Sequence, residues 1–357
     1  MKRLPGPAYP VYRSRPALLE RLRERGGGHP SMPRPSRPPR ERRRRPLTVG
    51  RVLRLLAAAI AAWLALSLAL FLISAQIQQG KLSAEAERAL DGAGFPLTSP
   101  TTILVLGSDL RSAGTREPGA TTSGPSRSDT ILLMRVGAGR SARLSIPRDT
   151  IVQIPGYGAG KINSAYAIGS APLAIETVRG YLGIEIDHLV EVDFESFPKL
   201  IDALGGVDYR GGCVVSRING GFRNGGYTLR LRAGESHLDG EQALALARTR
   251  QNDCNHRETD LARARRQQKI LAAIKGRLTS PAVFARLPWI SWHAPRTFRS
   301  DMAGPTLLGV FASMATSGEA PPRVLRPSGA STLSDGGSGL VVSDAERRAA
   351  VRRLLAG

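Results

Sequence analysis

The chain has 357 residues, 41% of them hydrophobic, so it can bury one sizeable core but is too short for several large domains. Its formal net charge of +22 would suit a nucleic-acid-binding protein. Much of that charge, however, lies in residues 1–54, which hold 16 lysines and arginines against three acidic residues and show no recognisable DNA-reading fold. Nucleic acid is therefore not an expected partner.

The N-terminal segment 1–54 is rich in proline and arginine and too poor in apolar residues to fold alone, so we expect a disordered basic tail. An uncharged apolar run follows directly and is long enough to span a membrane. We expect a membrane helix over 55–75 rather than a cleaved signal peptide, because the run is long and its leader bulky. The arginines before it should keep the N-terminus in the cytoplasm and attract anionic membrane lipid. The expected location is thus the cell membrane, with a single pass and the rest of the chain outside.

Residues 76–97 are expected to form a short helical stalk that ends in a stretch rich in glycine and proline. β-Branched and apolar runs then predict three successive strands, the third broken at Pro147, and a fourth strand after the next helix. Helical patterns follow, and Asp239 with Gln242 predicts a capping box at the start of one helix. The expected strands cover 101–109, 128–136, 143–154 and the start of 188–208, and the expected helices cover 162–183, the end of 188–208, 239–250 and 260–278.

Strands that alternate with helices indicate an α/β domain with a central sheet covered on both sides. Residues 283–357 are harder to interpret. Their pattern suggests one more helix within 289–315, a loop rich in glycine and serine over 328–339, and a closing helix from Asp344.

Arginines gather in two places. Six lie between Arg248 and Arg266, and the segment SIPRDT at 145–150 carries Arg148. A guanidinium stays charged at physiological pH and presents a planar fork of donors that matches two phosphate oxygens. The clusters therefore predict a protein that binds phosphate groups.

The chain has two cysteines, Cys213 and Cys254, and an even number outside the membrane favours a disulfide. The bridge would close a loop of about 42 residues and contribute about 4 kcal/mol in the chain-entropy treatment. It would also tie the arginine-rich segment to an upstream strand. The alternative is two buried free thiols.

Seven segments, taken in order, resemble the LytR-CpsA-Psr family of bacterial cell-envelope enzymes. The resemblance covers about 98–270, roughly half the chain. The segments are LVLGSD (104–109), RSDTILL (127–133), SIPRDT (145–150), KINSAYA (161–167), DALGGVD (202–208), LDGEQALALARTR (238–250) and RARRQQ (263–268).

The resemblance implies a phosphotransferase that moves a glycopolymer from a polyprenyl-pyrophosphate carrier onto peptidoglycan. The bond formed would be a phosphodiester to the C6 hydroxyl of muramic acid, and teichoic acids or arabinogalactan are such cargoes. The resemblance also implies a three-layer α/β/α fold with a mixed central sheet, an apolar groove for the lipid, and Mg²⁺ or Mn²⁺ at the pyrophosphate. The catalytic domain would cover 98–282, with 283–357 packed on it or continuing it.

The family's site residues carry over by position. Asp109 and Asp129 match the metal-binding carboxylates, which are hard oxygen donors suited to magnesium. The expected catalytic residues are these two aspartates with Arg148 and Arg263. The expected pyrophosphate-binding residues are Arg127, Arg148, Lys161, Arg248, Arg250, Arg263 and Gln267.

Other interpretations of these residues stay open. The aspartates could cap loops, and any single arginine could form a surface ion pair of little energetic consequence. For Arg257, Arg265 and Arg266 the latter is the better interpretation. Asp109 or Asp149 could accept the proton of the attacking hydroxyl, although the transition state of phosphoryl transfer needs little help from a base.

Two other functions also fit parts of the sequence. A membrane-anchored transcription attenuator would need nucleic-acid contacts by the tail, and a lipid pyrophosphatase would use the same site with water as the acceptor. The sequence also departs from the family pattern in a segment inserted between Arg250 and Asp260. A disulfide through Cys254 would restrain that insert.

Overall fold

The structure is a computed structural model and describes residues 48–78, 82–92, 94–108, 128–193, 196–217, 228–249, 251–256, 258, 260–334 and 336–356. The chain divides into a unit Met1–Leu53, of which only the last residues are described, and a unit Arg54–Gly357. The fold and the site below belong to the second unit. The predicted site residues Asp109, Arg127 and Arg250 lie outside the described residues, as does the expected disordered tail up to residue 47.

A mixed sheet forms the centre of the second unit. Strand β1 (Thr101–Ser108) pairs in parallel with β6 (His188–Asp193) and antiparallel with β2 (Ser128–Gly137), which pairs antiparallel with β3 (Arg140–Ile146). Among the described residues the sheet has seven strands in the order β11-β6-β1-β2-β3-β12, with β13 also paired to β3. The edge strands are β11 (Phe298–Ser300), β12 (Gly318–Glu319) and β13 (Arg323–Val324).

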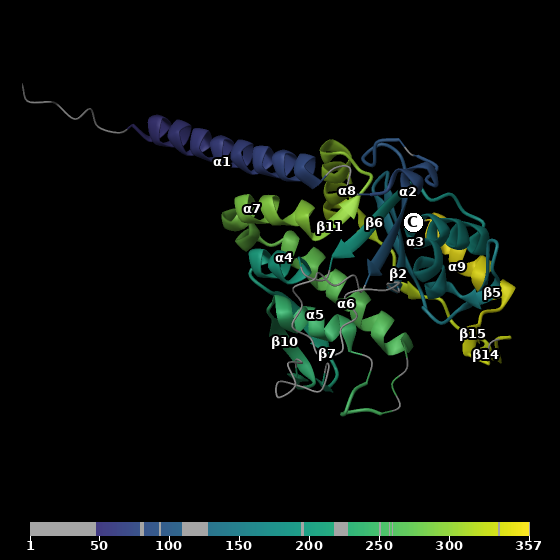
Figure 1. Cartoon of the computed structure of the whole chain (residues 1–357). Helices are drawn as coiled ribbons and strands as arrows, with labels where there is room; N and C mark the ends of the chain where they lie inside the picture. The colour runs from purple at the N-terminus through teal and green to yellow at the C-terminus, as the bar shows by residue number, and fades with distance from the viewer. Residues whose placement is uncertain are drawn as a thin grey trace, which may run out of the picture. The chain divides into compact units, whose positions relative to one another are not determined.

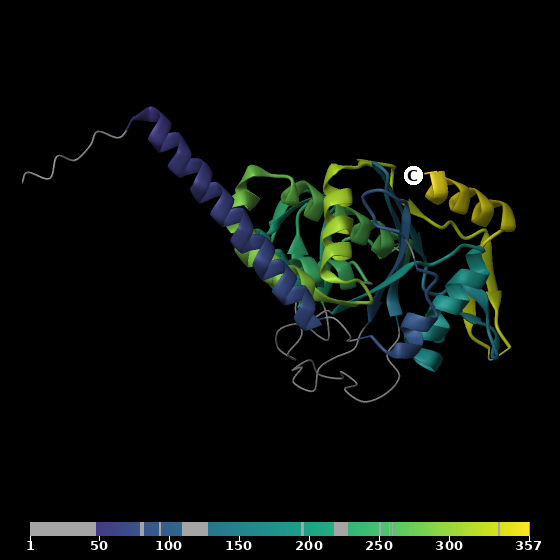
Figure 2. The ribbon, with the colours of Figure 1, turned by 90° about the horizontal axis from the view of Figure 1, so that it is seen from above.

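Alternate residues of the central strands face opposite layers, because successive side chains of a strand point to opposite sides of a sheet. Leu104 and Leu133 enter one core, while Ile103 and Leu132 enter another. Figure 1 shows the two layers: α3 (Ile162–Leu182) and α9 (Asp344–Ala356) lie on one face of the sheet and α8 (Gly304–Thr316) on the other, as the turned view in Figure 2 also shows. The expected three-layer α/β/α architecture is confirmed.

A second apolar core lies beside the sheet and is formed by helices and short strand pairs. Its helices are α4 (Phe197–Leu204), α5 (Gly240–Arg248), α6 (Asp260–Leu278) and α7 (Pro281–His293). The strand pairs are β7 (Val207–Gly211) with β10 (Gly234–Leu238), and β8 (Val214–Arg217) with β9 (Thr228–Leu231). The predicted capping box is present at the start of α5, where Asp239 accepts from Gln242 N and the Gln242 side chain accepts from Asp239 N. This core supports the two helices that carry the arginine cluster.

The predicted strand over 143–154 is two strands, because the chain turns at Pro147. β3 stays in the central sheet, whereas β4 (Ile151–Ile154) forms a separate hairpin with β5 (Gly158–Lys161). Proline offers no N–H to a sheet, so the ladder ends where it occurs.

The C-terminal part differs from the sequence expectation in two respects. The span expected to hold one helix holds parts of two, α7 and α8, with β11 between them. The expected loop at 328–339 is wrong, since β14 (Gly329–Thr332) and β15 (Ser338–Val341) pair there as a hairpin. Through β11, β12 and β13 the segment 283–357 extends the central sheet at both edges.

Helix α1 (Val49–Gln78) covers the predicted membrane span and, by length and composition, is able to cross a membrane. Its last turns also contact the domain, where Phe71 and Ala75 are buried with Phe298, Met302 and residues of α8. The short helix α2 (Ala84–Arg88), in the expected stalk, packs its Ala86 into the main core. Helix α2, between the apolar helix and β1, is thus held on the domain.

Candidate functional site

Strands β1 and β6 end, and strand β2 begins, at the same edge of the central sheet, which is the edge formed by strand ends. Ser108, the last residue of β1, lies opposite Ser128 of β2 and beside Asp193 of β6. The pairing of β1 with β2 shifts there, since Gly107 pairs with Thr130 and Ser108 with Ser128. Asp129 is therefore the extra residue of a β-bulge, a feature that often occurs beside active sites. The backbone thus brings Asp129 to this edge, while the other predicted metal ligand, Asp109, lies outside the described residues.

The turn after β3 brings Arg148 to the same edge. Ile146 pairs with Ile131 of β2, so the next residues of the chain emerge near Thr130. The turn is closed by Thr150, whose N–H and hydroxyl both donate to the Pro147 carbonyl, at 3.0 and 2.6 Å. Proline at this point ends the strand and exposes the following residues for binding.

Asp149 lies between two predicted pyrophosphate-binding cations. Its Oδ2 is 3.4 Å from Arg148 Nε, and its Oδ1 is 3.5 Å from Lys161 Nζ. All three side chains are partly accessible, with exposures between 18% and 31%. Lys161, expected from the family resemblance to bind pyrophosphate, thus lies against the Asp149 carboxylate.

Gln267 connects three elements at the inner side of this edge. Its amide nitrogen Nε2 lies 2.9 Å from Thr130 Oγ1 and 3.2 Å from the Ala247 carbonyl oxygen. Gln267 therefore joins α6 to β2 and α5, and its contact on β2, Thr130, directly follows Asp129 in the sequence. The side-chain amide holds the helix at the end of the sheet where Asp129 lies.

The arginines of α5 and α6 occupy three different environments. Arg263 is only 4% exposed and lies one helical turn before Gln267, on the same side of α6. Arg248 is the last residue of α5 and is partly buried, whereas Arg265 is exposed as expected. Three predicted pyrophosphate-binding arginines lie within the described residues. Arg148 follows β3, Arg248 is the last residue of α5, and Arg263 lies on α6, so all three belong to segments near the strand ends.

An apolar cavity of about 90 Å³ opens beside Gln267. It lies between the sheet and the helices α4, α5 and α6, and Gln267 and Thr130 supply its polar groups. The other lining residues are Val105, Gly107, Leu132, Val192, Phe197, Leu244, Ala247, Ile270 and Leu271. A cavity of this kind suits a hydrocarbon chain whose polar end reaches the strand ends.

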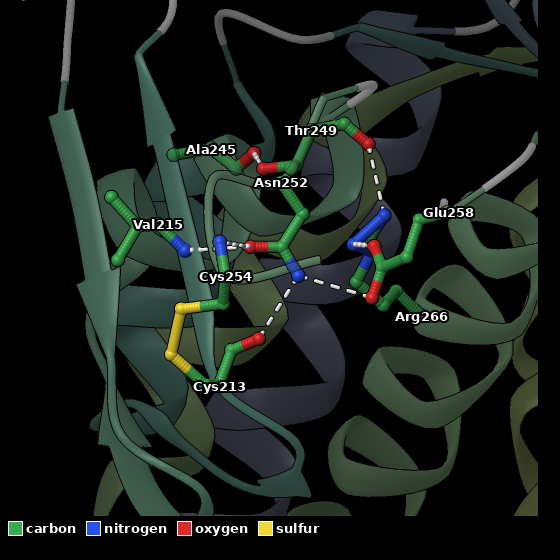
Figure 3. Close-up of polar contacts among 8 residues, drawn as sticks. All are labelled: Cys213, Val215, Ala245, Thr249, Asn252, Cys254, Glu258 and Arg266. Carbon is green, nitrogen blue, oxygen red and sulfur yellow. Dashed lines mark hydrogen bonds and ion pairs between the residues drawn. A yellow bond between two sulfur atoms is a disulfide. The ribbon is translucent and has the colours of Figure 1, made fainter. Parts of the chain in front are cut away.

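The disulfide between Cys213 and Cys254 is present and attaches the segment after α5 to the start of β8. Asn252, 1% exposed, makes the polar contacts around it (Figure 3). Its Oδ1 accepts from the N–H groups of Val215 and Cys254, at 2.9 and 3.1 Å, and its Nδ2 donates to the Cys213 carbonyl at 3.0 Å. The inserted segment is therefore fixed both covalently and by buried hydrogen bonds.

The same network continues to α6 through Glu258. Asn252 Nδ2 donates to Glu258 Oε1 at 3.0 Å, and Glu258 Oε2 lies 2.8 Å from a guanidinium nitrogen of Arg266 (Figure 3). Arg266 also donates to the Thr249 carbonyl at 3.4 Å. Nearby, burial raises the pKa of the Tyr209 hydroxyl, while Arg266 opposes this shift and Glu258 adds to it. The described residues between Arg248 and Arg263 are thus held at two places, by the disulfide at Cys254 and by the contacts of Thr249 and Glu258 with Arg266.

Two features of this network were not predicted from the sequence. Arg266 was expected to form at most a surface ion pair, but it is 5% exposed and paired inside the protein. It is buried because the inserted segment folds over α6 and supplies Glu258. The sequence did not predict a role for Asn252, and its position two residues before Cys254 is the only local signal that the sequence offers.

Asp129 is a carboxylate whose backbone lies at the strand ends, and a carboxylate has the chemistry to bind a divalent metal ion. Mg²⁺ prefers oxygen ligands, often one or two carboxylates completed by substrate phosphate and water. Within the described ranges no group of three or more histidine, cysteine, aspartate or glutamate side chains forms a complete metal site.

Comparison with known proteins yields consistent matches. A model described as the LytR_cpsA_psr family matches residues 71–349. The chain is 36% identical over 184 residues to the polyisoprenyl-teichoic acid–peptidoglycan teichoic acid transferase TagU of Enterococcus faecalis, over 51% of this chain and 54% of that protein. It is 38% identical over 179 residues to TagU of Halalkalibacterium halodurans, over 49% and 52% of the two chains. The chain thus spans about half the length of these curated relatives.

The fold also matches a solved structure. This is the LytR-CPS2A-psr family protein YwtF (TagT) of Bacillus subtilis, with a TM-score of 0.56 at 23% identity. The match covers 76% of this chain and 96% of that one.

Proposed function

The chain belongs to the LytR-CpsA-Psr family, and on this basis we propose that it transfers a glycopolymer from a polyprenyl-pyrophosphate carrier to peptidoglycan. The names of the two TagU relatives describe a transfer of this kind, and the TagT structure was solved with octaprenyl pyrophosphate lipid bound. The proposed product is a phosphodiester on the muramic acid C6 hydroxyl.

One observation carries the proposal. The apolar cavity ends at Gln267 and Thr130, beside the β-bulge at Asp129 and one helical turn from the buried Arg263. A ligand that fits both parts has an apolar hydrocarbon segment and an anionic head. A polyprenyl pyrophosphate has this composition, whereas a nucleotide or free sugar phosphate has no apolar part to fill the cavity.

In the proposed reaction the acceptor hydroxyl oxygen attacks the phosphorus that carries the sugar. A bond forms between that oxygen and phosphorus, the bond from phosphorus to the bridging oxygen breaks, and polyprenyl phosphate leaves. Arg148 and Arg263 are proposed to hold the pyrophosphate and offset charge on the leaving group, since fixed positive charge stabilises phosphoryl transfer. Lys161, Arg248, Arg127, Arg250 and Gln267 are proposed to complete the binding site.

Asp109 and Asp129 are proposed to hold Mg²⁺ or Mn²⁺ at the strand ends. When bound, such an ion would neutralise phosphate charge and orient the pyrophosphate oxygens. Asp149 is better placed to orient Arg148 and Lys161 than to act as a base, because each of its oxygens lies near one of these cations.

We further propose that α1 anchors the protein in the cell membrane, with the N-terminus in the cytoplasm and the domain outside. The arginines Arg51 and Arg54 at the start of α1 support this orientation, since positive residues flank the cytoplasmic end of membrane helices. The proposed catalytic region is 98–282, and 283–357 continues its sheet. Protease digestion of intact cells tests the topology: the domain should be cleaved from outside, and the tail should stay protected.

The function is tested with the full-length chain in proteoliposomes, a lipid-linked glycopolymer and peptidoglycan fragments. Transfer should appear as glycan attached to peptidoglycan together with released polyprenyl phosphate, and chelation of divalent metal should abolish it. Arg148→Ala and Arg263→Ala should each abolish transfer. Arg265, which lies on α6 near Arg263 in the sequence but is exposed, provides the control, and Arg265→Ala should leave transfer intact.

The same assay separates the alternative functions. Phosphorylated glycan released into solution without attachment would indicate a lipid pyrophosphatase. A folded protein that turns over none of several lipid-linked donors would overturn the enzymatic proposal and favour a regulatory role.

A further inference from the structure

Helix α7 lies along the apolar helix α1, and two hydrogen bonds join them. The indole Nε1 of Trp63 donates to the Phe284 carbonyl at 2.9 Å, and the Ser74 hydroxyl donates to the Trp292 carbonyl at 2.8 Å. Both pairs advance in the same direction, so the two helices run parallel. Figures 1 and 2 both show α7 beside α1.

Neither acceptor carbonyl lies in an uninterrupted stretch of helix: one loses its helical donor to a proline, and the other lies in the last turn of α7. Phe284 precedes Pro288 by four residues, and proline has no N–H to complete that helical hydrogen bond. Trp292 lies in the last turn of α7, and Pro295 follows three residues later. In water such carbonyls would be hydrated, whereas in a bilayer each needs a donor from the protein. Side chains of α1 supply both donors.

The contact at Trp63 lies within the apolar run. Ten residues separate Trp63 from Ile73, the end of that run, which is about 15 Å along a helix. Tilt of α1 reduces the corresponding depth below the membrane surface. If α1 crosses the bilayer, the first turns of α7 must therefore enter the same leaflet.

The exposed side chains of α7 suit this position. Phe284 is 43% exposed and Trp289 is 60% exposed, although one face of α7 is packed in the second core. Arg286 is the charged residue of the helix, and its guanidinium donates back to the Asp202 carbonyl at 3.4 Å. Aromatic residues are enriched where proteins meet the membrane interface.

Cations lie at the other end of the two helices. A cavity of about 530 Å³ there is lined by Gln78 of α1 and by Lys199, Arg296 and Arg299, and none of its described lining residues is acidic. The Arg296 guanidinium lies 3.8 Å from the Trp292 ring centre, and its Nε is buried without a hydrogen-bond partner among the described residues. The order of apolar aromatic and then cationic residues matches acyl chains followed by phosphate headgroups.

We propose that α7 is a second membrane-contacting element, whose Phe284 and Trp289 enter the acyl region beside α1 while Lys199, Arg296 and Arg299 contact lipid phosphates. The inference rests on the proposed membrane anchor. It places the domain directly on the bilayer, with its outer α7 surface in the lipid, instead of at the end of a flexible tether.

The three tryptophans of the chain make this measurable, since Trp63, Trp289 and Trp292 all lie in α1 or α7. The full-length Trp63→Phe/Trp292→Phe variant, with Trp289 as its sole fluorophore, is reconstituted in vesicles with acyl chains that are brominated or plain. Bromine should remove most of the Trp289 emission, and aqueous iodide should remove little. Trp63→Phe removes a donor to α7, so the same quenching measurements are also made on the wild type and on Trp289→Phe. The difference in quenched emission between these two proteins gives the contribution of Trp289 when Trp63 is present.

Two controls separate the possible failures. In the Trp289→Phe/Trp292→Phe variant, absence of bromine quenching at Trp63 would refute the anchor itself. Tyr157, in the turn between β4 and β5, is 65% exposed, so Tyr157→Trp in a chain without other tryptophans reports a site of similar exposure in water. Quenching of Trp63 by bromine would confirm the anchor. The membrane role of α7 would then be overturned by either of two results: iodide quenches Trp289 as strongly as the reporter at 157, or neither quencher affects Trp289.

Discussion

Gln267 Nε2 lies 2.9 Å from Thr130 Oγ1, and this contact joins the arginine-bearing helix α6 to the strand that carries Asp129. The same nitrogen donates to the Ala247 carbonyl on α5. A single amide thus sets how the helices meet the strand ends. The position of the buried Arg263, one turn earlier, depends on that arrangement.

Gln267→Leu should lower kcat/KM for glycan transfer about tenfold or more. The substitution removes the amide proposed to contact the pyrophosphate, and a hydrogen bond to a charged group contributes about 1.5–3 kcal/mol. Steady-state kinetics with a lipid-linked donor measures the effect, and Arg265→Ala provides the control on the same helix. Unchanged kinetics in the leucine variant would remove Gln267 from the site.

Asp149→Asn distinguishes orientation of cations from base catalysis. If Asp149 only orients Arg148 and Lys161, loss of these partly exposed ion pairs should raise KM by about fivefold at most, since such pairs contribute about 1 kcal/mol or less. Loss of a general base would instead lower kcat by about 10²-fold or more. Separate kcat and KM values decide between the two, and we expect the smaller effect.

Removal of the disulfide should destabilise the domain without unfolding it completely. The Cys213→Ala/Cys254→Ala variant should lose about 4 kcal/mol of unfolding free energy, because the bridge spans 41 residues. Asn252→Ala should cost about 3 kcal/mol through buried groups left unpaired. Denaturant titration of single and combined variants should give less than the sum, since both changes release the same segment. Full additivity would show that the two restraints act independently.

Gly240→Ala and Gly276→Ala should change stability in opposite directions. A Cβ at Gly240 would lie 2.2 Å from the Pro198 carbonyl oxygen, so α5 would have to move away from α4 at a cost of about 3 kcal/mol. A Cβ at Gly276 meets nothing within 4 Å, and alanine there should stabilise α6 by up to about 1 kcal/mol. Thermal unfolding measures both. Equal shifts in the two variants would contradict the packing of α5 against α4.

Asp187 should make stability depend on pH in the acidic range. Burial raises the pKa of its carboxyl above 3.8, although the N–H of Thr102 donates to it at 2.7 Å and opposes the shift. The folded state therefore holds this proton more tightly than the unfolded state. The resulting stability is present below pH 3.8 and is lost as pH rises through the folded-state pKa. Denaturant titrations at several pH values measure the unfolding free energy of the wild type and of Asp187→Asn. The wild type should lose stability relative to the variant as pH rises over that window. A difference in unfolding free energy that does not change with pH would refute the pKa shift.

Local patterns in the sequence were sufficient for much of this protein. The apolar run before Ile73, the alternating strands and helices, and the capping box at Asp239 each depend on residues close together in the chain, and the structure contains all three. The pairing of Cys213 with Cys254 followed from their number and expected compartment. The family itself was recognisable because its motifs are short and occur in a fixed order.

Other features depend on contacts between distant segments, and only the tertiary structure decided them. The edge strand β11 and the hairpin at 329–341 are too short to show a period in the sequence, so their pairing partners determine them. Asp129 becomes a bulge residue only in register with β1, and Arg266 is buried only because the inserted segment delivers Glu258. Likewise, the carbonyls of α7 obtain donors from α1 across more than 200 positions of the chain. Short-range propensity fixes the elements, whereas their mutual packing and the pairing of buried polar groups depend on the folded chain as a whole.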